Sequence, residues 1–548
     1  MSTSPDETQL TLAGTTHGPS IPAGFLLVFA VSLAAYAITA NRGPQWQDSG
    51  QFILAIYTKE LVNPLGLALS HPLHHWLGRA MVRLGAFEPA HAVTLVSSLG
   101  AAACVACVFG CVTCVTRSRA AGLFAAVSIG LAHTFWRLAT CTEVYTLSAG
   151  LLAAECWCLA AFVRGRRREY LWAMLLFNGL GLANHMQAIL TTPVLIVVAL
   201  WAWRRKRIRL ADILFGVMVW VIGSLPYTAL VVGELTVSGD WASTLRSALL
   251  GESGRYGGNV LNVHPSLRIL AVSIGFTILC FPNLLLPAAG VGLARAGRLG
   301  VESATIKALL AGLILHALFV CRYNVVDQHT FFLPTYVLLT IFGGFGAAWI
   351  QKSSSRTLCG TGWKPVPQVP LETLAKPNKT ARRAIAAAIV LLLATPAFYA
   401  VMPAIARHFQ VLRNVERAKP YRDDYVYIFS PWGVLDHSAQ VMSETAVRLA
   451  GSDGLILVED PMAMPAVEYQ ALRGGSSDIE VRRLAPDTPA AKVKREAVLS
   501  DAAQAGQAGR SVVLVPATLV SEPPAGLSLR REGDLYLIVG PAPGEAPG

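Results

Sequence analysis

Charged residues are scarce in this chain: they make up only 14% of its 548 residues, whereas hydrophobic residues reach 53%. A soluble globular protein carries about 25% charged residues. The stretches without charge run to roughly 20 residues each, which is the length that a helix needs to cross about 30 Å of hydrocarbon. The composition therefore excludes an ordinary soluble protein and indicates an integral membrane protein with many spans.

Common nucleotide and metal motifs are also missing. The sequence contains no GxxxxGK(S/T), GxGxxG or HExxH pattern, so nucleotide hydrolysis, dinucleotide binding and zinc proteolysis have no support. The net charge of +12 does not indicate a nucleic-acid partner, because the basic residues lie mainly in short loops between apolar segments.

The ten cysteines show no disulfide framework. Cys104, Cys107, Cys111 and Cys114 have spacings that resemble a zinc site. They lie inside an apolar segment without charged neighbours, and their intervals place them on one face of a helix. Small side chains on such a face let helices approach closely, and we favour this interpretation over a metal site.

Eleven apolar segments have the length and composition of membrane spans. If the N-terminus is cytoplasmic, the inner loops hold about 20 Lys and Arg residues and the outer loops about 9, as the positive-inside rule expects. We therefore expect a multi-pass protein of the plasma (inner) membrane with a cytoplasmic N-terminus. The expected spans are 21–40, 91–115, 120–136, 144–163, 170–184, 187–203, 211–233, 268–294, 303–321, 330–350 and 384–403.

Composition divides the chain into three parts. Residues 1–20 are expected to form a cytoplasmic tail, and residues 21–403 a transmembrane domain that contains a flexible cytoplasmic linker at 351–383, rich in Pro, Gly and Ser. An odd number of spans places residues 404–548 outside the cytoplasm. There, short apolar runs such as "DGLILVED" and "SVVLVP" alternate with helical patterns, which is typical of a small α/β domain with a largely parallel sheet.

Polar residues gather on the outer side of the predicted bundle. Asp48 follows the first span, Glu143, Asn184 and His185 lie at the outer ends of later spans, and Asp327 lies in the outer segment "CRYNVVDQHTFFLP". Each has an ordinary alternative: a solvated acid, a carboxylate at a helix N-terminus, or a bundle histidine with satisfied hydrogen bonds. Ionisable residues at membrane depth tend to be functional, and their common side predicts a pocket at that surface.

The segment "HPLHHWLGR" supplies His71, His74 and His75. Three histidines within five residues can bind a metal ion, but the pattern favours a short amphipathic helix in the outer interface, with His74, Trp76 and Arg79 at headgroup depth. We predict no metal and no cofactor. A divalent ion is compatible with the sequence, but no clear ligand set is present.

Five segments in a fixed order resemble one protein family. They are "WQDSGQFILAIYT", "HPL" followed by "WLGR", "TEVYTLSAGLLA", "GLGLANHMQAIL" and "YNVVDQHTFFLPTYVLL". The chain resembles the family of GT-C glycosyltransferases that includes the animal transmembrane protein O-mannosyltransferase and its uncharacterised bacterial relatives. Two positions depart from the family pattern, because Asn63 stands where the family has His and Gln51 where it has Glu. Neither departure affects Asp48.

The resemblance implies a GT-C-like membrane fold and a mannosyltransferase-like hexosyltransferase. Such an enzyme joins a sugar from a polyprenyl-phosphate carrier in the membrane lipid to a protein or glycan acceptor on the outer face. The acceptor hydroxyl needs a base, and Asp48 at the membrane edge is expected to be that base. Arginine suits phosphate, so Arg137, Arg255 and Arg322 are the expected ligands of the lipid phosphate. The expected substrate-binding residues are Glu143, Tyr145, Asn184, His185, His71 and Asp327.

Three other functions remain open from the sequence. A transporter or flippase of a lipid-linked substrate would show inverted repeats and polar groups near the membrane midplane, whereas no internal repeat is evident and the polar groups lie at one face. A glycan ligase, which moves a whole glycan, has the same requirements as a glycosyltransferase. A non-catalytic scaffold with an outer binding domain leaves the acid-bearing loop unexplained.

Overall fold

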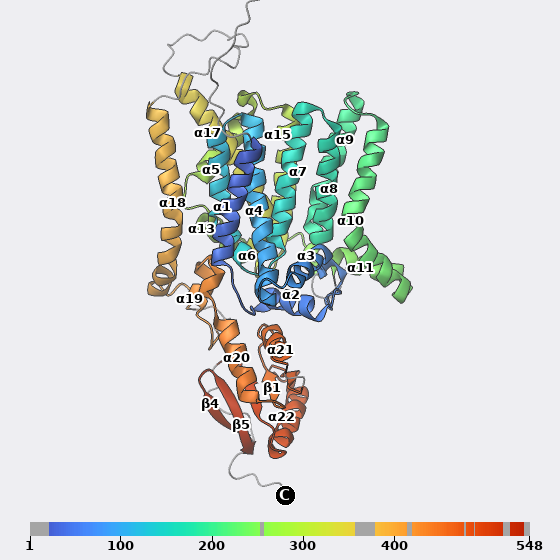
Figure 1. The fold of residues 1–548 in the computed structure, drawn as a ribbon, viewed down its shortest axis with the longest axis vertical. Helices are drawn as coiled ribbons and strands as arrows, with labels where there is room; N and C mark the ends of the chain where they lie inside the picture. Colours follow the sequence, from blue (N-terminus) through green and yellow to red (C-terminus); the bar gives the residue numbers. More distant parts are fainter. Residues whose placement is uncertain are drawn as a thin grey trace, which may run out of the picture.

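The computed structural model of the protein describes residues 21–251, 257–356, 379–413, 419–475, 478–486, 488–518 and 527–541. Long helices lie side by side in a bundle, and a smaller C-terminal region with a β-sheet is attached to one end of it (Figure 1). We call this end the domain-side end. The expected tail at residues 1–20 and the middle of the expected linker, residues 357–378, lie outside the described residues.

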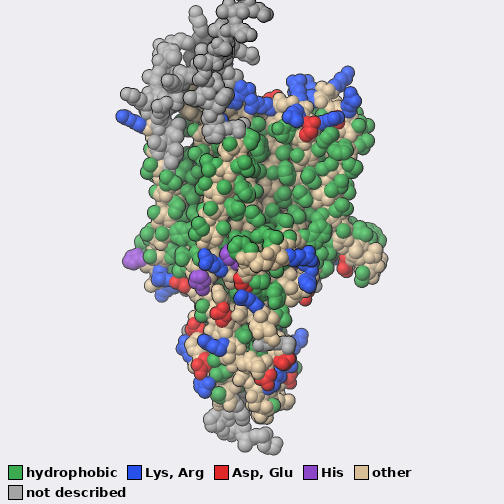
Figure 2. Space-filling view, viewed as in Figure 1, with side chains coloured by type: hydrophobic (Ala, Val, Ile, Leu, Met, Phe, Trp, Pro, Cys, Tyr) green, Lys and Arg blue, Asp and Glu red, His purple; other side chains and the backbone are tan. Residues whose placement is uncertain are grey.

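The bundle helices are the apolar segments that the sequence marks as spans. In lipid the backbone must satisfy its own hydrogen bonds, and a helix does so within one segment. Hydrophobic side chains cover the visible face of the bundle, and Lys and Arg gather at the end opposite the C-terminal region (Figure 2). The bundle helices are α1 (Ile21–Thr39), α4 (Pro89–Thr116), α5 (Arg119–Gly130), α6 (His133–Thr140), α7 (Tyr145–Gly165), α8 (Arg168–Asn184), α9 (Thr192–Arg204), α10 (Leu210–Ser238), α13 (Leu267–Cys280), α14 (Leu285–Arg295), α15 (Ser303–Arg322), α17 (Leu333–Arg356) and α18 (Lys379–His408).

Among the described residues, eight helices are long and apolar enough to cross a membrane, and two bent pairs raise this number to ten. The pair α5 and α6 is bent by 65°, and the pair formed by α13 and the helix after it is bent by 98°. The second bend follows Pro282, which cannot continue a helix. The remaining expected span, 170–184, corresponds to α8, whose 17 residues are about 26 Å long. The protein is therefore an integral multi-pass membrane protein in which two expected spans are broken.

Helices take up more of the chain near the expected linker than the sequence indicates. The linker was expected at 351–383. α17 continues past the start of this range to Arg356, and α18 begins at Lys379, before the end of the range. α18 also continues to His408 and contains Pro396 and Pro403.

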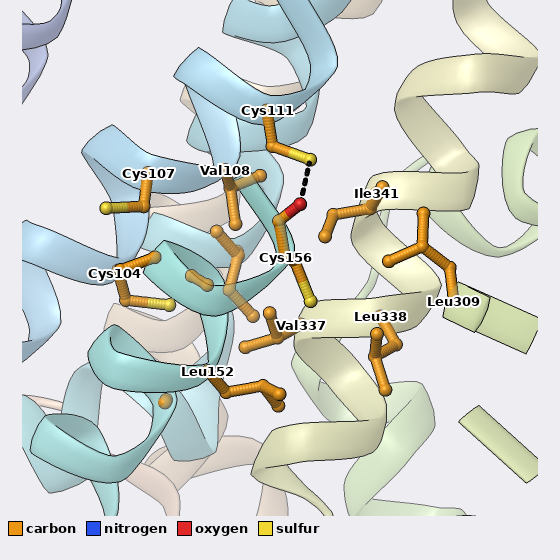
Figure 3. Packing of buried hydrophobic residues seen from close by; sticks show 14 of the residues in the cluster. Cys104, Cys107, Val108, Cys111, Leu152, Cys156, Leu309, Val337, Leu338 and Ile341 are labelled. Atoms are coloured by element: carbon orange, nitrogen blue, oxygen red, sulfur yellow. Dashed lines mark hydrogen bonds between the residues drawn. The ribbon is translucent and has the colours of Figure 1, made fainter. Parts of the chain in front are cut away.

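Small residues bring the bundle helices close together. Cys104, Cys107 and Cys111 of α4 lie in the core beside α7, where the Cys111 thiol donates to the Cys156 carbonyl oxygen at 3.7 Å (Figure 3), while Cys114 is half-buried. A Cβ added at Gly346 of α17 would lie 1.9 Å from the Ala288 carbonyl oxygen of α14, so these two helices meet backbone to backbone. The interpretation of the cysteines as a packing face of α4 agrees with this position.

Short elements cover the domain-side end of the bundle. In α3, Trp76 is exposed while His74 and His75 are buried, which confirms an amphipathic helix. His74 was expected at headgroup depth, and this is wrong: its ring packs 5.6 Å from the Phe52 ring of α2, because the helical phase turns His74 away from Trp76. These elements are α2 (Gln47–Thr58), η1 (Leu67–Leu69), α3 (Pro72–Arg83), η2 (Met186–Leu190), α11 (Trp241–Leu250), α12 (Gly257–Val260) and α16 (Gln328–Phe331), while η3 (Ala296–Leu299) follows α14.

The C-terminal region contains a five-stranded sheet of order β2-β1-β3-β5-β4. β1 (Leu455–Val458) pairs in parallel with β2 (Glu480–Arg483) and β3 (Val512–Val515), as an α/β pattern predicts. β4 (Leu527–Glu532) and β5 (Leu535–Pro541) form an antiparallel hairpin that makes the sheet mixed. The accompanying helices are α19 (Asp424–Phe429), η5 (Gly433–Leu435), α20 (Ser438–Ala450), α21 (Met464–Arg473) and α22 (Lys492–Gln507).

The C-terminal region is fixed to the bundle by polar and apolar contacts. Tyr469 of α21 donates a hydrogen bond to Glu88 at 2.5 Å and packs edge-on against Tyr57 of α2. On the other side of the junction, the Asn41 amide donates to the carbonyl oxygens of Gly433 and Asp436. The sequence segments that carry Asp48 and Glu143 therefore lie next to this junction.

Candidate functional site

Asp48 lies in the first turn of α2, at the domain-side end of the bundle. Its side chain remains accessible to solvent. The surrounding protein nevertheless removes enough water from the carboxylate to raise the pKa of Asp48 to about 6, and the negative charge of Asp327 adds to this effect. Asp48 is thus ionised at neutral pH but is a much stronger base than an ordinary aspartate.

Glu143 lies in the turn before α7 and contacts the same helix as Asp48. The Ser49 hydroxyl donates a hydrogen bond to Glu143 Oε1 at 2.8 Å. Ser97 of α4 fixes the backbone, because its hydroxyl donates to the Glu143 carbonyl oxygen and accepts from the Glu143 amide. Burial, with the charge of Asp48 as the next cause, raises the pKa of Glu143 to about 8, so this carboxyl group carries a proton at neutral pH.

The two acids therefore have different protonation states around pH 7. The two carboxyl groups lie close together and differ in their access to water, and both effects push their pKa values apart. Such a pair combines a base with a hydrogen-bond donor. Asp48 can accept a proton, and Glu143 can donate a hydrogen bond. Asp327 acts electrostatically on both groups, so a third carboxyl group lies near this pair.

Two histidines and an asparagine form a connected group near the acids. The His71 and His185 rings stack at 5.2 Å between centroids, and Nδ1 of His71 lies 2.7 Å from the Asn184 carbonyl oxygen. The Asn184 amide in turn donates to the Val144 carbonyl oxygen at 2.9 Å and to the Ser148 hydroxyl at 2.7 Å. Burial lowers the pKa of His71 to about 4, so the ring is neutral.

Aromatic rings continue this group. The Tyr145 ring, at the start of α7, lies 5.4 Å from His185 and 5.2 Å from Phe331 of α16. Tyr323 packs against the other side of this group, 4.9 Å from Phe331. Aromatic faces beside hydrogen-bonding groups are suited to a ligand that has both apolar C–H faces and hydroxyls.

The three arginines predicted from the sequence differ in position. Arg137 of α6 lies 4.3 Å over the Tyr427 ring and donates to the Ser430 carbonyl oxygen at 3.4 Å, and its charge lowers the pKa of Glu143. Arg322 at the end of α15 donates to the carbonyl oxygens of Val260 and Asn262, away from these contacts. Arg255 lies outside the described residues.

Several contributing residues could not be identified from their sequence context. Ser49 and Ser97 orient Glu143, and Tyr427 of the C-terminal region contacts Arg137. Only Ser49 had a local signal, because it directly follows Asp48. Within the part of the chain that the structure describes, no group of three or more His, Cys, Asp or Glu side chains is arranged to hold a metal ion.

Comparisons with known proteins agree with this arrangement. Residues 48–209 match the family model of the protein O-mannosyl-transferase TMEM260 N-terminal domain. The protein O-mannosyl-transferase TMEM260 of Mus musculus is 26% identical over 378 residues, which cover 62% of this chain and 51% of the mouse protein. The chain thus spans about half the length of this relative. The matched segment 48–209 includes Asp48, Glu143, Asn184, His71 and His185.

The fold is similar to that of ArnT in two solved structures. ArnT from Cupriavidus metallidurans in the apo state has a TM-score of 0.56 and 15% sequence identity, and the match covers 95% of this chain and 98% of ArnT. ArnT bound to undecaprenyl phosphate has a TM-score of 0.54 and 16% identity over 96% of this chain and 99% of ArnT. The chain therefore has the fold of ArnT, and its residues 48–209 match the N-terminal domain of the protein O-mannosyl-transferase TMEM260.

Proposed function

We propose that the chain is an integral-membrane glycosyltransferase that moves a sugar from a polyprenyl-phosphate-linked donor to an acceptor hydroxyl, with Asp48 as the general base. The observation that carries this proposal is the pair of acids with different protonation states, Asp48 ionised and Glu143 protonated, at the domain-side end of a GT-C fold. A base of intermediate strength fits proton transfer near neutral pH.

The proposed step is a displacement at the anomeric carbon. The acceptor oxygen forms a bond to this carbon while the bond from the carbon to the lipid phosphate oxygen breaks, and its electron pair leaves with the phosphate. The acceptor proton moves to Asp48. A positioned base of this kind contributes about 10²–10⁴-fold to a rate.

The surrounding residues have roles in binding the sugar. Protonated Glu143 can donate a hydrogen bond to a sugar oxygen, and Asp327 can accept one from a sugar hydroxyl. Tyr145 and His185 present ring faces, and His71 is neutral and so adds no positive charge beside the base. Asn184 holds the histidine group to the start of α7 through its hydrogen bonds to Val144 and Ser148.

Arg137 is the favoured ligand of the departing lipid phosphate. A guanidinium group pairs with phosphate oxygens in a bidentate manner and neutralises the developing charge. Its charge acts on Glu143, so the group lies within electrostatic reach of the acid pair. Arg322 and Arg255 remain candidates for further phosphate contacts, although Arg322 is engaged with the carbonyl oxygens of Val260 and Asn262.

The charge distribution supports an orientation in the plasma (inner) membrane. Lys and Arg gather at the bundle end opposite the C-terminal region (Figure 2), and such loops favour the cytoplasm. Asp48, Glu143 and the C-terminal region then face the extracytoplasmic side. The lipid tail of the donor would remain in the bilayer while its sugar reaches Asp48 and Glu143.

The names of the relatives support the substrate classes. One solved ArnT structure is bound to undecaprenyl phosphate, which is a polyprenyl phosphate. The mouse relative is named as a protein O-mannosyl-transferase, which favours a hexose such as mannose and a protein acceptor over a glycan acceptor. The sugar, the lipid and the acceptor of this chain are part of the proposal.

A donor-cleavage assay tests the proposal. The purified full-length chain in nanodiscs would be incubated with a panel of polyprenyl-phosphate-linked hexoses, and the release of polyprenyl phosphate would be measured for the wild type and Asp48→Asn. We expect release by the wild type and at least a hundredfold loss in the variant. Equal turnover in a folded variant would remove Asp48 from the mechanism. Movement of labelled lipid between leaflets without cleavage would establish a flippase instead.

A further inference from the structure

The residue before α2 is anchored in the C-terminal region. Trp46 is 3% exposed and packs into the apolar core formed by α20, α21 and the sheet. Its indole N–H donates to the Ser438 hydroxyl at 2.9 Å, and its ring stacks on Tyr421 with 5.1 Å between centroids. The side chain of a residue two positions before Asp48 is therefore held by the C-terminal region.

The next residue adopts an unusual backbone conformation. Gln47 has φ +58°, the left-handed region that residues other than Gly, Asn and Asp rarely adopt. Its amide donates to the Met462 carbonyl oxygen at 3.0 Å, and its side-chain amide lies 2.9 Å from the Met462 sulfur. Such a conformation persists only where the surroundings fix it, and here the loop between β1 and α21 does so.

The loop that holds Gln47 is itself fixed by buried charges. Asp460 is 1% exposed and accepts a hydrogen bond from the Met462 amide at 3.1 Å. Lys419 forms an ion pair with Asp460 at 3.0 Å, and the Tyr421 hydroxyl donates to the same carboxylate oxygen at 3.0 Å. Tyr421 thus contacts both Asp460 and Trp46, so the loop and the α2 entrance form one connected unit.

We propose that the C-terminal region positions the catalytic base: the Trp46–Gln47 turn, clamped by Ser438 and Met462, sets the direction of the Asp48 carboxylate. The C-terminal region is then required for the chemical step itself, and not only for the recruitment of an acceptor. Trp46 and Gln47 are positioning residues that act through Asp48. This inference rests on the proposed function of Asp48.

The position of the clamp separates this role from simple docking. Two other hydrogen bonds already attach the C-terminal region to the bundle. Tyr469 of α21 donates to Glu88, and on the opposite side Asn41 donates to the Gly433 carbonyl oxygen. Neither contact requires a left-handed residue. The left-handed turn lies directly next to Asp48, where a small rotation of the first helical turn changes the direction of the carboxylate.

A series at Gln47 tests the clamp because it changes the backbone preference at one position. Asn and Gly adopt positive φ readily, whereas the β-branched Val does not. With polyprenyl-phosphate-linked mannose as the donor, we expect Gln47→Asn and Gln47→Gly to keep kcat within about threefold of the wild type. Gln47→Val should lower kcat roughly ten- to hundredfold while KM for the donor changes by less than about twofold.

Tyr469→Phe is the matched control. It removes one hydrogen bond between the C-terminal region and the bundle without touching the α2 entrance, so its kcat should stay near the wild-type value. As an independent pair, Trp46→Phe and Ser438→Ala remove the same indole hydrogen bond from either side, so the double variant should lose no more kcat than Trp46→Phe alone. This pair decides the question if Gln47→Val does not fold.

The pH dependence gives a readout that altered stability does not move. A loosened turn exposes Asp48 to more water, so the acid limb of kcat/KM should shift to lower pH in Gln47→Val, with Glu143 and Asp327 as the acidic groups that face Asp48. Wild-type kcat in folded Gln47→Val, or an equal loss in Tyr469→Phe, would overturn the clamp. Full activity of Asp48→Asn in the same assay would instead overturn the proposed base.

Discussion

The pH dependence of sugar transfer is the sharpest test of the acid pair. The proposed mechanism needs Asp48 ionised and Glu143 protonated. With pKa values of about 6 and about 8, both conditions hold together only between these limits. We therefore expect kcat/KM to rise as pH increases through about 6 and to fall as pH increases through about 8.

Glu143→Gln removes one limb of this profile. The amide has the shape of a protonated carboxyl group and donates a hydrogen bond, but it does not titrate, and its oxygen can still accept from Ser49. At pH 9 only about one tenth of wild-type Glu143 would be protonated, because each pH unit above a pKa is a factor of ten. The variant should keep its pH 7 activity at pH 9, whereas the wild type should lose about tenfold.

The assay is the initial rate of polyprenyl phosphate release from pH 4.5 to 9.5 in nanodiscs, with a check at each pH that the protein remains folded. An alkaline limb near pH 8 that persists in Glu143→Gln would refute the assignment of that limb to Glu143. Loss of activity at every pH in the folded variant would show that Glu143 acts as a carboxylate. An acid limb near pH 4 would mean that Asp48 is an ordinary solvated aspartate.

Three further predictions follow from other contacts. Asp327→Asn removes the charge that helps to raise the pKa of Asp48, so the acid limb of kcat/KM should move to lower pH. Arg137→Lys keeps the charge but loses the planar fork, and it should raise KM for the donor about tenfold in steady-state assays, ~1.4 kcal/mol. A Cβ at Gly433 would lie 2.3 Å from the Thr140 carbonyl oxygen, so Gly433→Ala should cost about 1–3 kcal/mol and lower Tm, whereas Gly165→Ala, with open space, should not.

The convergence of the site could be predicted because helix ends alternate between the two sides of a membrane. This parity places Asp48, Glu143, Asn184 and His185 at one end whatever the packing, and the structure brings His185 against His71 and Tyr145. The parallel part of the sheet was also predictable, since "LILV" and "VVLV" are buried apolar runs. These features depend on local patterns and on the order of the elements.

Other features depend on contacts between distant parts of the chain. The contact of Arg137 with Tyr427 joins residues almost 300 positions apart, and no local pattern indicates it. The bend after Pro282 was visible only as a proline, and the apolar runs on both sides made the segment look like one span. β4 was missed because "LSLRRE" carries three charges, although the two residues Gly533 and Asp534 that follow are typical of a hairpin turn.

The position of the proposed base agrees with two opposing requirements. A donor with a long lipid tail keeps the reaction at the membrane edge, where an acid must lose water to become a useful base but cannot be placed in hydrocarbon at acceptable cost. Asp48 lies in the first turn of α2, where burial by the surrounding protein raises its pKa to about 6. A short helix at the membrane edge has few neighbours of its own to hold it, and the Trp46 anchor supplies this rigidity from outside the bundle. We therefore expect the orientation of the proposed base to depend on the C-terminal region at the entrance of α2.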